Sequence, residues 1–500
     1  MESKFYISTP IYYPSSNFHI GHCYTTVIAD CIARYKRLLG YDVYFQTGTD
    51  EHGQKIENKA MEAHVSPKEY VDKIIMDAKD LWKSLGISYD YFIRTTDSNH
   101  MEAVQKIFKK LYDQGDIYKG DYSGLYCTPC ESFWTETQLV SGKCPDCGRE
   151  VHLIKEEAYF FRLSNYADRL VEYYDSHPDF LLPVSRKNEM INNFIKPGLQ
   201  DLCVSRTSFK WGIPVSFDSD HVIYVWIDAL TNYITSLGYP DNLDGKFSRY
   251  WPCDLHLVGK EIVRFHAIIW PCILMALGLS LPKQIFGHGW LIVDGGKISK
   301  SLGNYKDPRE YISRYGVDAV RYFVLREVPF GSDGNFSEEA LVGRINSDLA
   351  NVLGNLVNRT ISMANKYFDG CVSWKNSYDE DKEFLEAVSC LESKVKSSMD
   401  KYEINVCLGH IFDVLRRSNK YVDETMPWVL YKNGDLERLE AVLYNLLYSI
   451  KVCACFLRPF IPSTCDEIFK QLNVGSVSFD DVYEKTDFKV NEASILFERF

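Results

Sequence analysis

Four cysteines in two closely spaced pairs are the most distinctive ligand set in the chain. Two residues separate Cys127 from Cys130 and Cys144 from Cys147, and residues 131–143 lie between the pairs. Each pair encloses a proline and therefore fits a tight knuckle. Four thiolates at this spacing are typical of a closed, structural zinc site. Two disulfides or four unligated thiols are the alternatives, and the spacing favours zinc over both.

Two further motifs carry groups that suit a phosphate ligand. His19-Ile20-Gly21-His22 follows a predicted strand and begins a predicted helix, where unpaired N–H groups and the helix dipole attract anions. Gly21 leaves room for a nucleotide, and both imidazoles can donate to phosphoryl oxygens. The segment from Lys297 to Ser301, with Lys300 within it, follows two glycines and predicts a cationic loop suited to a polyphosphate. Taken singly, surface histidines and a solvated basic turn are the alternatives.

The elements that must position these groups follow from the pattern of apolar residues. Residues 4–9 predict a buried strand before Pro10, residues 19–39 a helix closed by Gly40, and residues 43–45 a second strand. This order predicts a parallel βαβ unit of an α/β fold, with its ligand crevice at the C-terminal ends of the strands. Further strands are expected at 222–227, 254–258 and 284–286, and further helices at 68–85, 101–114 and 263–277.

Composition limits the class of protein. A chain of 500 residues is too long for one core and predicts two to four domains. The 56 basic and 68 acidic residues give a net charge of −12, which excludes a uniformly basic nucleic-acid coat but allows a local basic groove. The longest apolar stretch, 267–281, contains Pro271 and is too short to span a membrane, and no signal or transit peptide is recognisable. The odd count of 15 cysteines favours a reducing compartment, so a cytoplasmic protein is expected.

The two phosphate motifs together resemble the paired signatures of class I aminoacyl-tRNA synthetases. Ile298 stands where that family most often has Met, a swap that conserves volume. Several other segments are similar to the methionyl-tRNA synthetases, and the resemblance runs from Phe5 to the C-terminus. These segments are Ser8–Tyr13, Thr47–Gly53, Ser205–Pro214, Val225–Ala229 and Gly259–His266.

The resemblance implies a domain organisation that the apolar pattern alone leaves open. Residues 1–114 and 215–289 would be the two halves of a Rossmann-like catalytic domain with a parallel sheet. Residues 115–214 would be a connective insertion with the zinc knuckles, and 290–344 a linking region with the Lys297 loop. Residues 345–500, whose apolar residues recur at helical spacing, would form an all-α helical-bundle anticodon-binding domain.

The resemblance also implies an activity: activation of methionine with ATP and Mg²⁺, followed by transfer of methionyl to the terminal adenosine of tRNA(Met). Phosphate stabilisation would come from His19 and His22, and Lys297 and Lys300 would face the pyrophosphate. The set expected to bind ATP is His19, Gly21, His22, Gly259, Glu261, His288, Lys297 and Lys300. The set expected to bind methionine is Ile11, Tyr13, Asp50, Trp226, Ala229, Leu230, Tyr233, Ile262 and His266. Asp50 would hold the ammonium group, and the aromatic and apolar residues suit a soft thioether.

Three residues of the helical domain complete the implied site. Asn355 and Arg359 share one helical face, and an exposed Trp428 could stack on an unpaired base, so the family positions imply contacts with the CAU anticodon. The residues alone favour solvated or packed side chains at these positions. The implied partners are methionine, ATP and tRNA(Met), without membrane or DNA, and a monomer is expected. The alternative functions are another class I synthetase for an apolar amino acid and a non-catalytic tRNA-binding protein with this fold.

Overall fold

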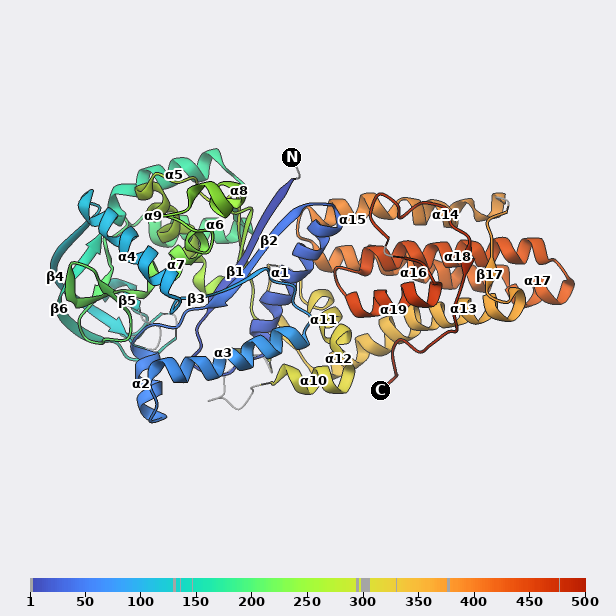
Figure 1. Cartoon of the computed structure of the whole chain (residues 1–500), viewed down its shortest axis with the longest axis horizontal. Helices are drawn as coiled ribbons and strands as arrows, with labels where there is room; N and C mark the ends of the chain where they lie inside the picture. Colours follow the sequence, from blue (N-terminus) through green and yellow to red (C-terminus); the bar gives the residue numbers. More distant parts are fainter. Residues whose placement is uncertain are drawn as a thin grey trace. The chain divides into compact units, whose positions relative to one another are not determined.

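The computed structural model describes residues 3–128, 132–134, 136–145, 147–293, 296–297, 306–329, 331–375, 378–475 and 477–500 (Figure 1). The chain divides into two compact units. The first comprises Met1–Ala29, Asp42–Lys83 and Ile87–Gly289, and the second comprises Asp30–Tyr41, Ser84–Gly86 and Trp290–Phe500.

A six-stranded sheet with only parallel neighbours organises the first unit. The strand order is β3-β2-β1-β12-β13-β7, so β1 has its sequence neighbour β2 on one side and the distant β12 on the other. This is the reversal point of a Rossmann-like sheet, where ligands bind at the C-terminal strand ends. The strands are β1 (Lys4–Tyr12), β2 (Asp42–Thr49), β3 (Tyr91–Arg94), β7 (Leu181–Leu182), β12 (Leu255–Gly259) and β13 (Ile285–His288).

The central strands are buried along almost their whole length, as expected for a parallel sheet covered on both faces. Glycine is required near the end of β2, because a Cβ at Gly48 would lie 2.1 Å from the carbonyl oxygen of Ile93 on β3. Two residues later the chain leaves the sheet at Asp50. A larger residue at position 48 would therefore force β2 and β3 apart just before Asp50.

The helices of the first unit agree with most of the predicted ranges, but one predicted strand is wrong. Residues 222–227 were expected to be extended, whereas the strand ends at Ile223 and Val225 begins a helix. The apolar run is ambiguous because a buried helix carries apolar residues on all sides, as a buried strand does. The helices that lie wholly or partly in this unit are α1 (Ile20–Leu38), α2 (Gln54–Glu62), α3 (Pro67–Ser84), α4 (Ser98–Asp113), α5 (Ala167–Ser176), α6 (Val184–Met190), α7 (Val225–Thr235), α8 (Ser248–Tyr250) and α9 (Trp270–Leu277), with η6 (Phe265–Ile269) leading into α9. From Asp30 onward, α1 belongs to the second unit.

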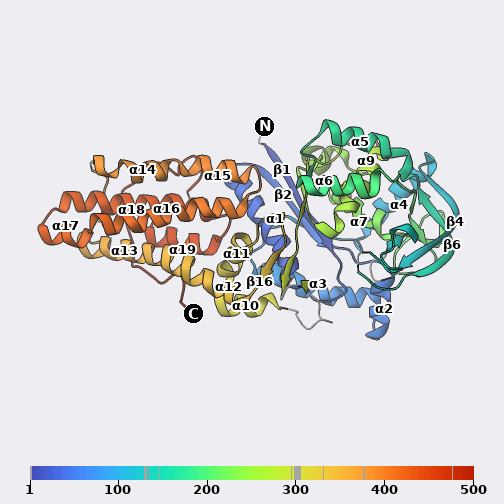
Figure 2. The same cartoon turned by 180° about the vertical axis from the view of Figure 1, so that it is seen from behind.

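Antiparallel strands replace the βα alternation in the middle of the first unit, as the change in sequence character predicts. The long pair β4 and β6 lies side by side in both views (Figures 1 and 2). Two small sheets have the orders β5-β4-β6-β8 and β10-β11-β9. Their strands are β4 (Ile117–Cys127), β5 (Ser132–Trp134), β6 (His152–Phe161), β8 (Leu202–Cys203), β9 (Ser205–Arg206), β10 (Ile213–Val215) and β11 (Asp218–Ile223).

The second unit begins with a small sheet and continues as a bundle of helices (Figure 2). The sheet has the order β15-β14-β16, from β14 (Leu291–Val293), β15 (Gly296–Lys297) and β16 (Gly334–Phe336). Helical spacing predicts one apolar core face from Phe384, Val388, Leu391, Val395, Met399 and Tyr402. The first five side chains are buried, which confirms them as core, whereas Tyr402 is half-buried and lies beyond the helix that ends at Met399. The helices are α10 (Pro308–Tyr315), α11 (Val317–Arg326), α12 (Glu338–Arg344), η8 (Ile345–Gly354), α13 (Asn355–Phe368), α14 (Lys382–Ser389), α15 (Leu391–Met399), α16 (Ile404–Thr425), α17 (Pro427–Asn433), α18 (Leu436–Leu457) and α19 (Pro462–Leu472).

A buried ion pair links distant segments of the second unit. Arg321 on α11 lies 2.8 Å from the carboxylate of Asp30, and both side chains have no exposed surface. The same guanidinium donates to the carbonyl oxygens of Leu85, Pro459 and Phe460. Because these bonds satisfy the buried charge, Arg321 can hold the short segments around Asp30 and Leu85 within this unit.

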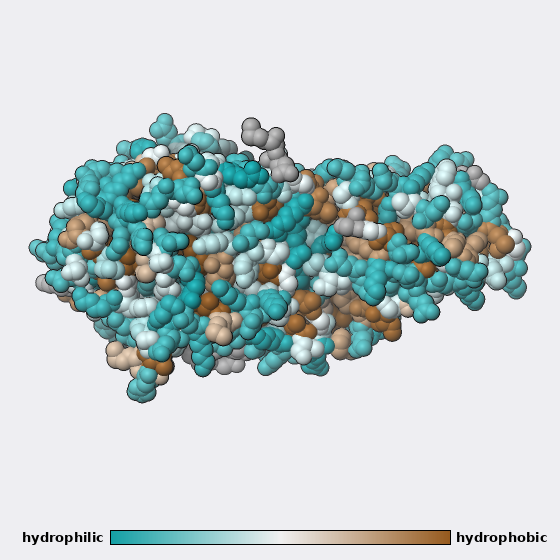
Figure 3. All heavy atoms as spheres, in the orientation of Figure 1, coloured by the Kyte–Doolittle hydropathy of each residue, from teal (hydrophilic) through white to brown (hydrophobic). Residues whose placement is uncertain are grey.

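One helix among the described residues is long and apolar enough to cross a membrane by length and composition. It is α18, and 89% of its most apolar window is buried inside the protein. The surface seen in Figure 3 is mostly hydrophilic, with apolar residues scattered over it. The hydrophobicity of α18 is therefore accounted for by its place in the core of the bundle.

Candidate active site

Four of the residues expected to bind ATP or methionine lie at the C-terminal edge of the parallel sheet. Ile11 lies at the end of β1, Asp50 directly follows β2, Gly259 ends β12, and His288 ends β13. The backbone N–H of Asp50 donates to the carbonyl oxygen of Tyr12, at 3.0 Å, which joins the ends of β2 and β1. The sequence separates these four residues by up to 277 positions, from Ile11 to His288, and the parallel sheet brings them to one edge.

His19 and His22 cap the first helix reciprocally. The Nδ1 of His19 accepts from the backbone N–H of Gly21, and the Nδ1 of His22 accepts from the backbone N–H of His19, each at 3.1 Å. This is a capping box built from imidazoles, because His19 precedes α1 and His22 is its third residue. An accepting Nδ1 places the proton of each neutral ring on Nε2. Both histidines therefore carry an Nε2–H donor at the helix N-terminus.

His288 ties the end of β13 to α1. Its Nδ1–H donates to the carbonyl oxygen of Gly289 at 2.7 Å, so its Nε2 accepts from the hydroxyl of Thr25 at 2.9 Å. Burial lowers the pKa of His288, although the hydrogen bond to Gly289 and the charge of Glu261 act in the opposite direction. His288 therefore stays neutral, with its ring orientation set by two partners.

Most of the expected methionine residues come together in two adjoining apolar clusters. Ile11, Trp226 and Ala229 pack with Tyr126 and Tyr224. Trp226 also stacks on the ring of Phe265, with ring centroids 3.4 Å apart and the planes at 9°. Leu230 and Tyr233 belong to the larger core of the unit, against which Trp226 and Ile262 pack. Tyr13 is the exception, because it packs with Ile56, Val71 and Ile75.

Tyr233 and His266 form the polar end of this apolar region. The Nδ1–H of His266 donates to the carbonyl oxygen of Ile262 at 3.0 Å, so its Nε2 accepts from the hydroxyl of Tyr233 at 2.7 Å. Burial lowers the pKa of His266 to about 4, partly offset by the bond to Ile262. Burial also raises the pKa of Tyr233. Both side chains are therefore neutral near pH 7.

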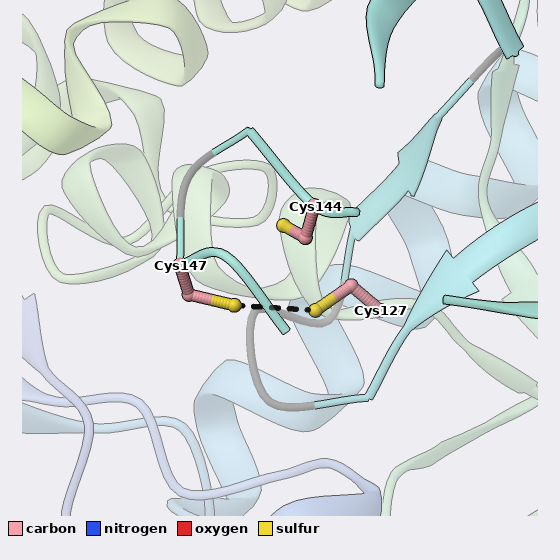
Figure 4. A group of neighbouring side chains, drawn as sticks. All are labelled: Cys127, Cys144 and Cys147. Atoms are coloured by element: carbon pink, nitrogen blue, oxygen red, sulfur yellow. Dashed lines mark hydrogen bonds between the residues drawn. The ribbon is translucent and has the colours of Figure 1, made fainter. Parts of the chain in front are cut away.

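Three of the four predicted metal ligands lie together. The thiol sulfurs of Cys127, Cys144 and Cys147 all lie within 4.8 Å of one another, and the sulfurs of Cys127 and Cys147 are 3.6 Å apart (Figure 4). Tetrahedral zinc with Zn–S bonds of about 2.3 Å places sulfurs about 3.8 Å apart, so the cluster has the right size for a metal ion. Cys130 lies outside the described residues. No disulfide joins any cysteine that the structure describes.

The cationic loop falls mostly outside the described residues. The backbone of Lys297 belongs to β15 and pairs with Ile292 on β14, but the structure does not describe its side chain, and Lys300 lies outside the described chain. The roles of both lysines stay predictions.

The expected anticodon residues belong to two helices of the second unit. Asn355 and Arg359 lie on α13, and Arg359 Nη2 is 3.4 Å from a carboxylate oxygen of Asp423, near the end of α16. Trp428 follows on α17 with 45% of its surface exposed. The exposed indole leaves room for stacking on a base.

Two buried residues beside the expected site, Glu51 and Phe265, were not among those predicted to bind a ligand. The carboxylate of Glu51 has no exposed surface and accepts two hydrogen bonds from Arg94, at 2.7 and 2.8 Å. Phe265, which stacks on Trp226, also had no assigned role. Glu51 lies within the Thr47–Gly53 motif and Phe265 within Gly259–His266, and this position is the signal that points to them. Their roles depend on partners far away in the sequence.

Comparison with known proteins identifies the family. The family model "tRNA synthetases class I (M)" matches residues 5–153 and 148–361, and "Anticodon-binding domain of tRNA ligase" matches residues 381–499. A methionine–tRNA ligase of Caldanaerobacter subterraneus subsp. tengcongensis is 60% identical over 100% of this chain and 79% of its own length. That of Bacillus subtilis is 53% identical over 99% of this chain and 78% of its own length.

Solved structures agree with this match. The Mycobacterium tuberculosis methionyl-tRNA synthetase in complex with methionyl-adenylate is 42% identical, with a TM-score of 0.96 over 99% of this chain and 100% of that chain. Its apo form is 40% identical, with a TM-score of 0.89 over 100% of this chain and 99% of that chain. The two family models, the identities and the shared fold agree, and the chain therefore belongs to the methionine–tRNA ligases, the methionyl-tRNA synthetases of class I.

Proposed function

We propose that this chain performs the methionine–tRNA ligase reaction of its family at the C-terminal edge of the parallel sheet. The observation that carries the proposal is the gathering there of Asp50, the Trp226–Tyr233 helix face and the capped His19–His22 pair. The related Mycobacterium tuberculosis enzyme was solved with methionyl-adenylate, which is the product expected of the first step.

In the first step, a carboxylate oxygen of methionine attacks the α-phosphorus of ATP, and the bond from that phosphorus to the bridging oxygen of pyrophosphate breaks. No protein nucleophile is needed, so catalysis consists of positioning and charge stabilisation. The Nε2–H groups of His19 and His22 donate to phosphoryl oxygens, and Lys297 and Lys300 balance the charge on pyrophosphate. Mg²⁺ enters with the phosphates of ATP. Gly21, Gly259, Glu261 and His288 hold the nucleotide.

Methionine is selected by one carboxylate and an apolar slot. Asp50 binds the ammonium group. The thioether lies among Ile11, Trp226, Ala229, Leu230 and Ile262, with Tyr233 and His266 at the polar end; Tyr13 contributes from the neighbouring cluster. The neutral Tyr233–His266 pair suits an uncharged sulfur, because a charged imidazole would have to be desolvated there.

In the second step, the 2′-hydroxyl of the terminal adenosine of tRNA(Met) takes the methionyl group and AMP leaves. Asn355, Arg359 and Trp428 contact the anticodon, and the exposed indole of Trp428 stacks on a base. A cytoplasmic location and a monomeric state complete the proposal.

The cysteine cluster would hold one structural zinc ion. Cys127, Cys144 and Cys147 would be three of its ligands, and the spacing of the pairs makes Cys130 the fourth. Four thiolates would leave no position open for water, so the ion would be structural. Because Trp134 packs against Cys127 and Cys144, the ion would stabilise the tip of the antiparallel insertion.

The first test is ATP–pyrophosphate exchange by the purified, zinc-loaded protein with each of the twenty amino acids and no tRNA. Strong preference for methionine is expected. Exchange with a different amino acid would overturn the methionine pocket, and no exchange at all would favour a non-catalytic tRNA-binding protein. A Lys300→Ala protein that keeps the full activation rate would overturn the role given to Lys300.

A further inference from the structure

A fully buried carboxylate connects the two sides of the proposed methionine site. Asp228 on α7 has no exposed surface. Its Oδ2 lies 2.7 Å from Nδ1 of His52, and its Oδ1 lies 2.8 Å from Nε2 of His100. An ionised carboxylate can only accept, so both imidazoles donate to it. Each oxygen of Asp228 therefore receives a hydrogen bond from a different histidine.

These bonds join the segments that carry the proposed methionine ligands. His52 stands two residues after Asp50, in the loop that follows β2. Asp228 stands two residues after Trp226 and directly before Ala229, on α7. The His52–Asp228 bond spans 176 residues of sequence. It therefore sets the separation between the ammonium-binding carboxylate and the wall of the thioether slot.

Other hydrogen bonds also hold the loop after β2, but they connect it to elements other than α7. Arg94 on β3 binds the carboxylate of Glu51, and the indole N–H of Trp211 donates to the carbonyl oxygen of Glu51 at 2.6 Å. The backbone N–H of Gly53 donates to the carbonyl oxygen of Trp211 at 3.0 Å. These bonds tie the loop to β3 and to the segment before β10, whereas His52 ties it to α7.

His100 on α4 is the second histidine that donates to the carboxylate of Asp228. His100 is 2% exposed, and its Nδ1 lies 2.7 Å from the hydroxyl of Thr235, the last residue of α7. Burial raises the pKa of Asp228, but attraction to His52 and the hydrogen bonds from both histidines outweigh this and lower it. A buried ionic group of this kind is a poor source of stability compared with apolar packing, which favours a positional role.

We propose that Asp228 is a positioning residue for amino-acid binding, acting through His52 on the loop that carries Asp50. This inference rests on the proposed binding of methionine by Asp50 and α7. It predicts a specific effect on methionine, because the nucleotide is held by residues of β12, β13 and the start of α1.

The first experiment measures exchange kinetics of Asp228→Asn, which keeps the shape but removes the charge and one acceptor. The KM for methionine is expected to rise about 10- to 100-fold, as for loss of a buried hydrogen bond to a charged group. The KM for ATP and the kcat should stay close to wild type. Asp241→Asn is the control, because Asp241 pairs with Lys106 on the surface of the same unit. An unchanged KM for methionine, or equal changes for both substrates, would overturn the proposal.

A matched pair of variants at His52 keeps the test decisive if Asp228→Asn does not fold. Asparagine places its amide nitrogen near the position of Nδ1, whereas glutamine places it near Nε2. His52→Asn should therefore retain the bond to Asp228 and a nearly normal KM for methionine, and His52→Gln should raise that KM. Equal KM values for the two variants would contradict a positioning role.

A double-mutant cycle with Asp50→Asn separates this inference from the function on which it rests. Once the carboxylate of Asp50 is removed, its position no longer matters, so adding Asp228→Asn should change the KM for methionine much less than in wild type. Additive effects would overturn the positioning role while leaving Asp50 as a ligand. No effect of Asp50→Asn alone would overturn the proposed methionine site and this inference with it.

Discussion

At the scale of single residues, hydrogen bonds determine which nitrogen carries the proton in four histidines of the proposed site. His19 and His22 accept through Nδ1, whereas His266 and His288 donate through Nδ1. The first pair therefore offers donors to an anion, and the second pair offers neutral acceptors to hydroxyl groups. One residue type thus serves two chemical purposes within the same unit.

Two substitutions of His22 separate its capping role from its proposed catalytic role. In His22→Asn, the amide oxygen can accept from the N–H of His19 in place of Nδ1, but the Nε2–H donor is lost. The exchange kcat should fall about 100-fold or more, as for removal of a transition-state donor. In His22→Ala, the cap is lost as well, with an additional cost of about 1 kcal/mol in stability. Equal activity of His22→Asn and wild type, measured by pyrophosphate exchange, would contradict the donor role.

Burial of His266 predicts a dependence of stability on pH. Its pKa is lowered to about 4 by burial, whereas an exposed histidine titrates near pH 6.5. Between these two values the unfolded chain binds a proton at His266 and the folded chain does not. The contribution of His266 to the free energy of unfolding is therefore complete above pH 6.5 and is lost as pH falls towards 4. Between pH 6.5 and 5 the loss is about 2 kcal/mol. In urea unfolding between pH 6.5 and 5, the free energy of unfolding of His266→Gln should fall by this amount less than that of wild type. Identical pH profiles for the two proteins would contradict the role of His266.

At the scale of elements, the insertion depends on a small cluster at its tip. The pair β4 and β6 is long, Cys127 ends β4, and Cys144 and Cys147 lie between β5 and β6. Among the described residues, Cys127 and Cys144 pack with the apolar side chains of Trp134, Leu139 and Val151. Because this apolar cluster is small, the proposed metal ion would add to the stability of the tip.

Removal of the metal should loosen this tip and leave the parallel sheet folded. The purified protein is expected to contain about one zinc per chain by elemental analysis, and Cys144→Ser should lose it. Hydrogen exchange should then rise in residues 127–151 with little change in β1 and β2. Cys371→Ser is the control, because Cys371 is exposed and lies in the other unit. Zinc retained at full stoichiometry by Cys144→Ser would contradict the ligand assignment.

At the scale of the whole molecule, the helices matched by the anticodon-binding model belong to the second unit, whereas most residues proposed to bind methionine and ATP belong to the first. Lys297 and Lys300, which are proposed to face the pyrophosphate, fall in the range of the second unit. Amino-acid activation without tRNA therefore tests the proposed methionine and ATP sites, and aminoacylation also tests the anticodon-binding helices.

Two tryptophans of the second unit with similar exposure allow a matched test. Trp428 is 45% exposed and Trp374 is 43% exposed. Trp428→Ala should raise the KM for tRNA about 5- to 100-fold, because stacking of one base contributes about 1–3 kcal/mol. Trp374→Ala should not, since its ring already packs under the ammonium group of Lys485. Neither change should alter pyrophosphate exchange. Equal effects on tRNA would contradict the role of Trp428.

Local patterns in the sequence were enough for much of the fold. The predicted first strand, the helix from His19 and the following strand match β1, α1 and β2 closely, because periodicity and end signals act over a few residues. The strand predicted at 222–227 was wrong because an apolar segment of that length fits a buried strand or a buried helix equally well. Likewise, the spacing of the cysteines predicted a cluster, and three of its members are found together.

What the sequence by itself determined is the order of elements and the family, because motifs and hydrophobic periods are carried by neighbouring residues. Only the tertiary structure decided which polar groups meet inside the protein. His52 lies 176 residues and His100 128 residues before Asp228 in the chain, yet both histidines donate to the buried carboxylate of Asp228. Such a contact leaves no local pattern, because its cost is desolvation and its compensation comes from partners that folding alone brings within hydrogen-bonding distance.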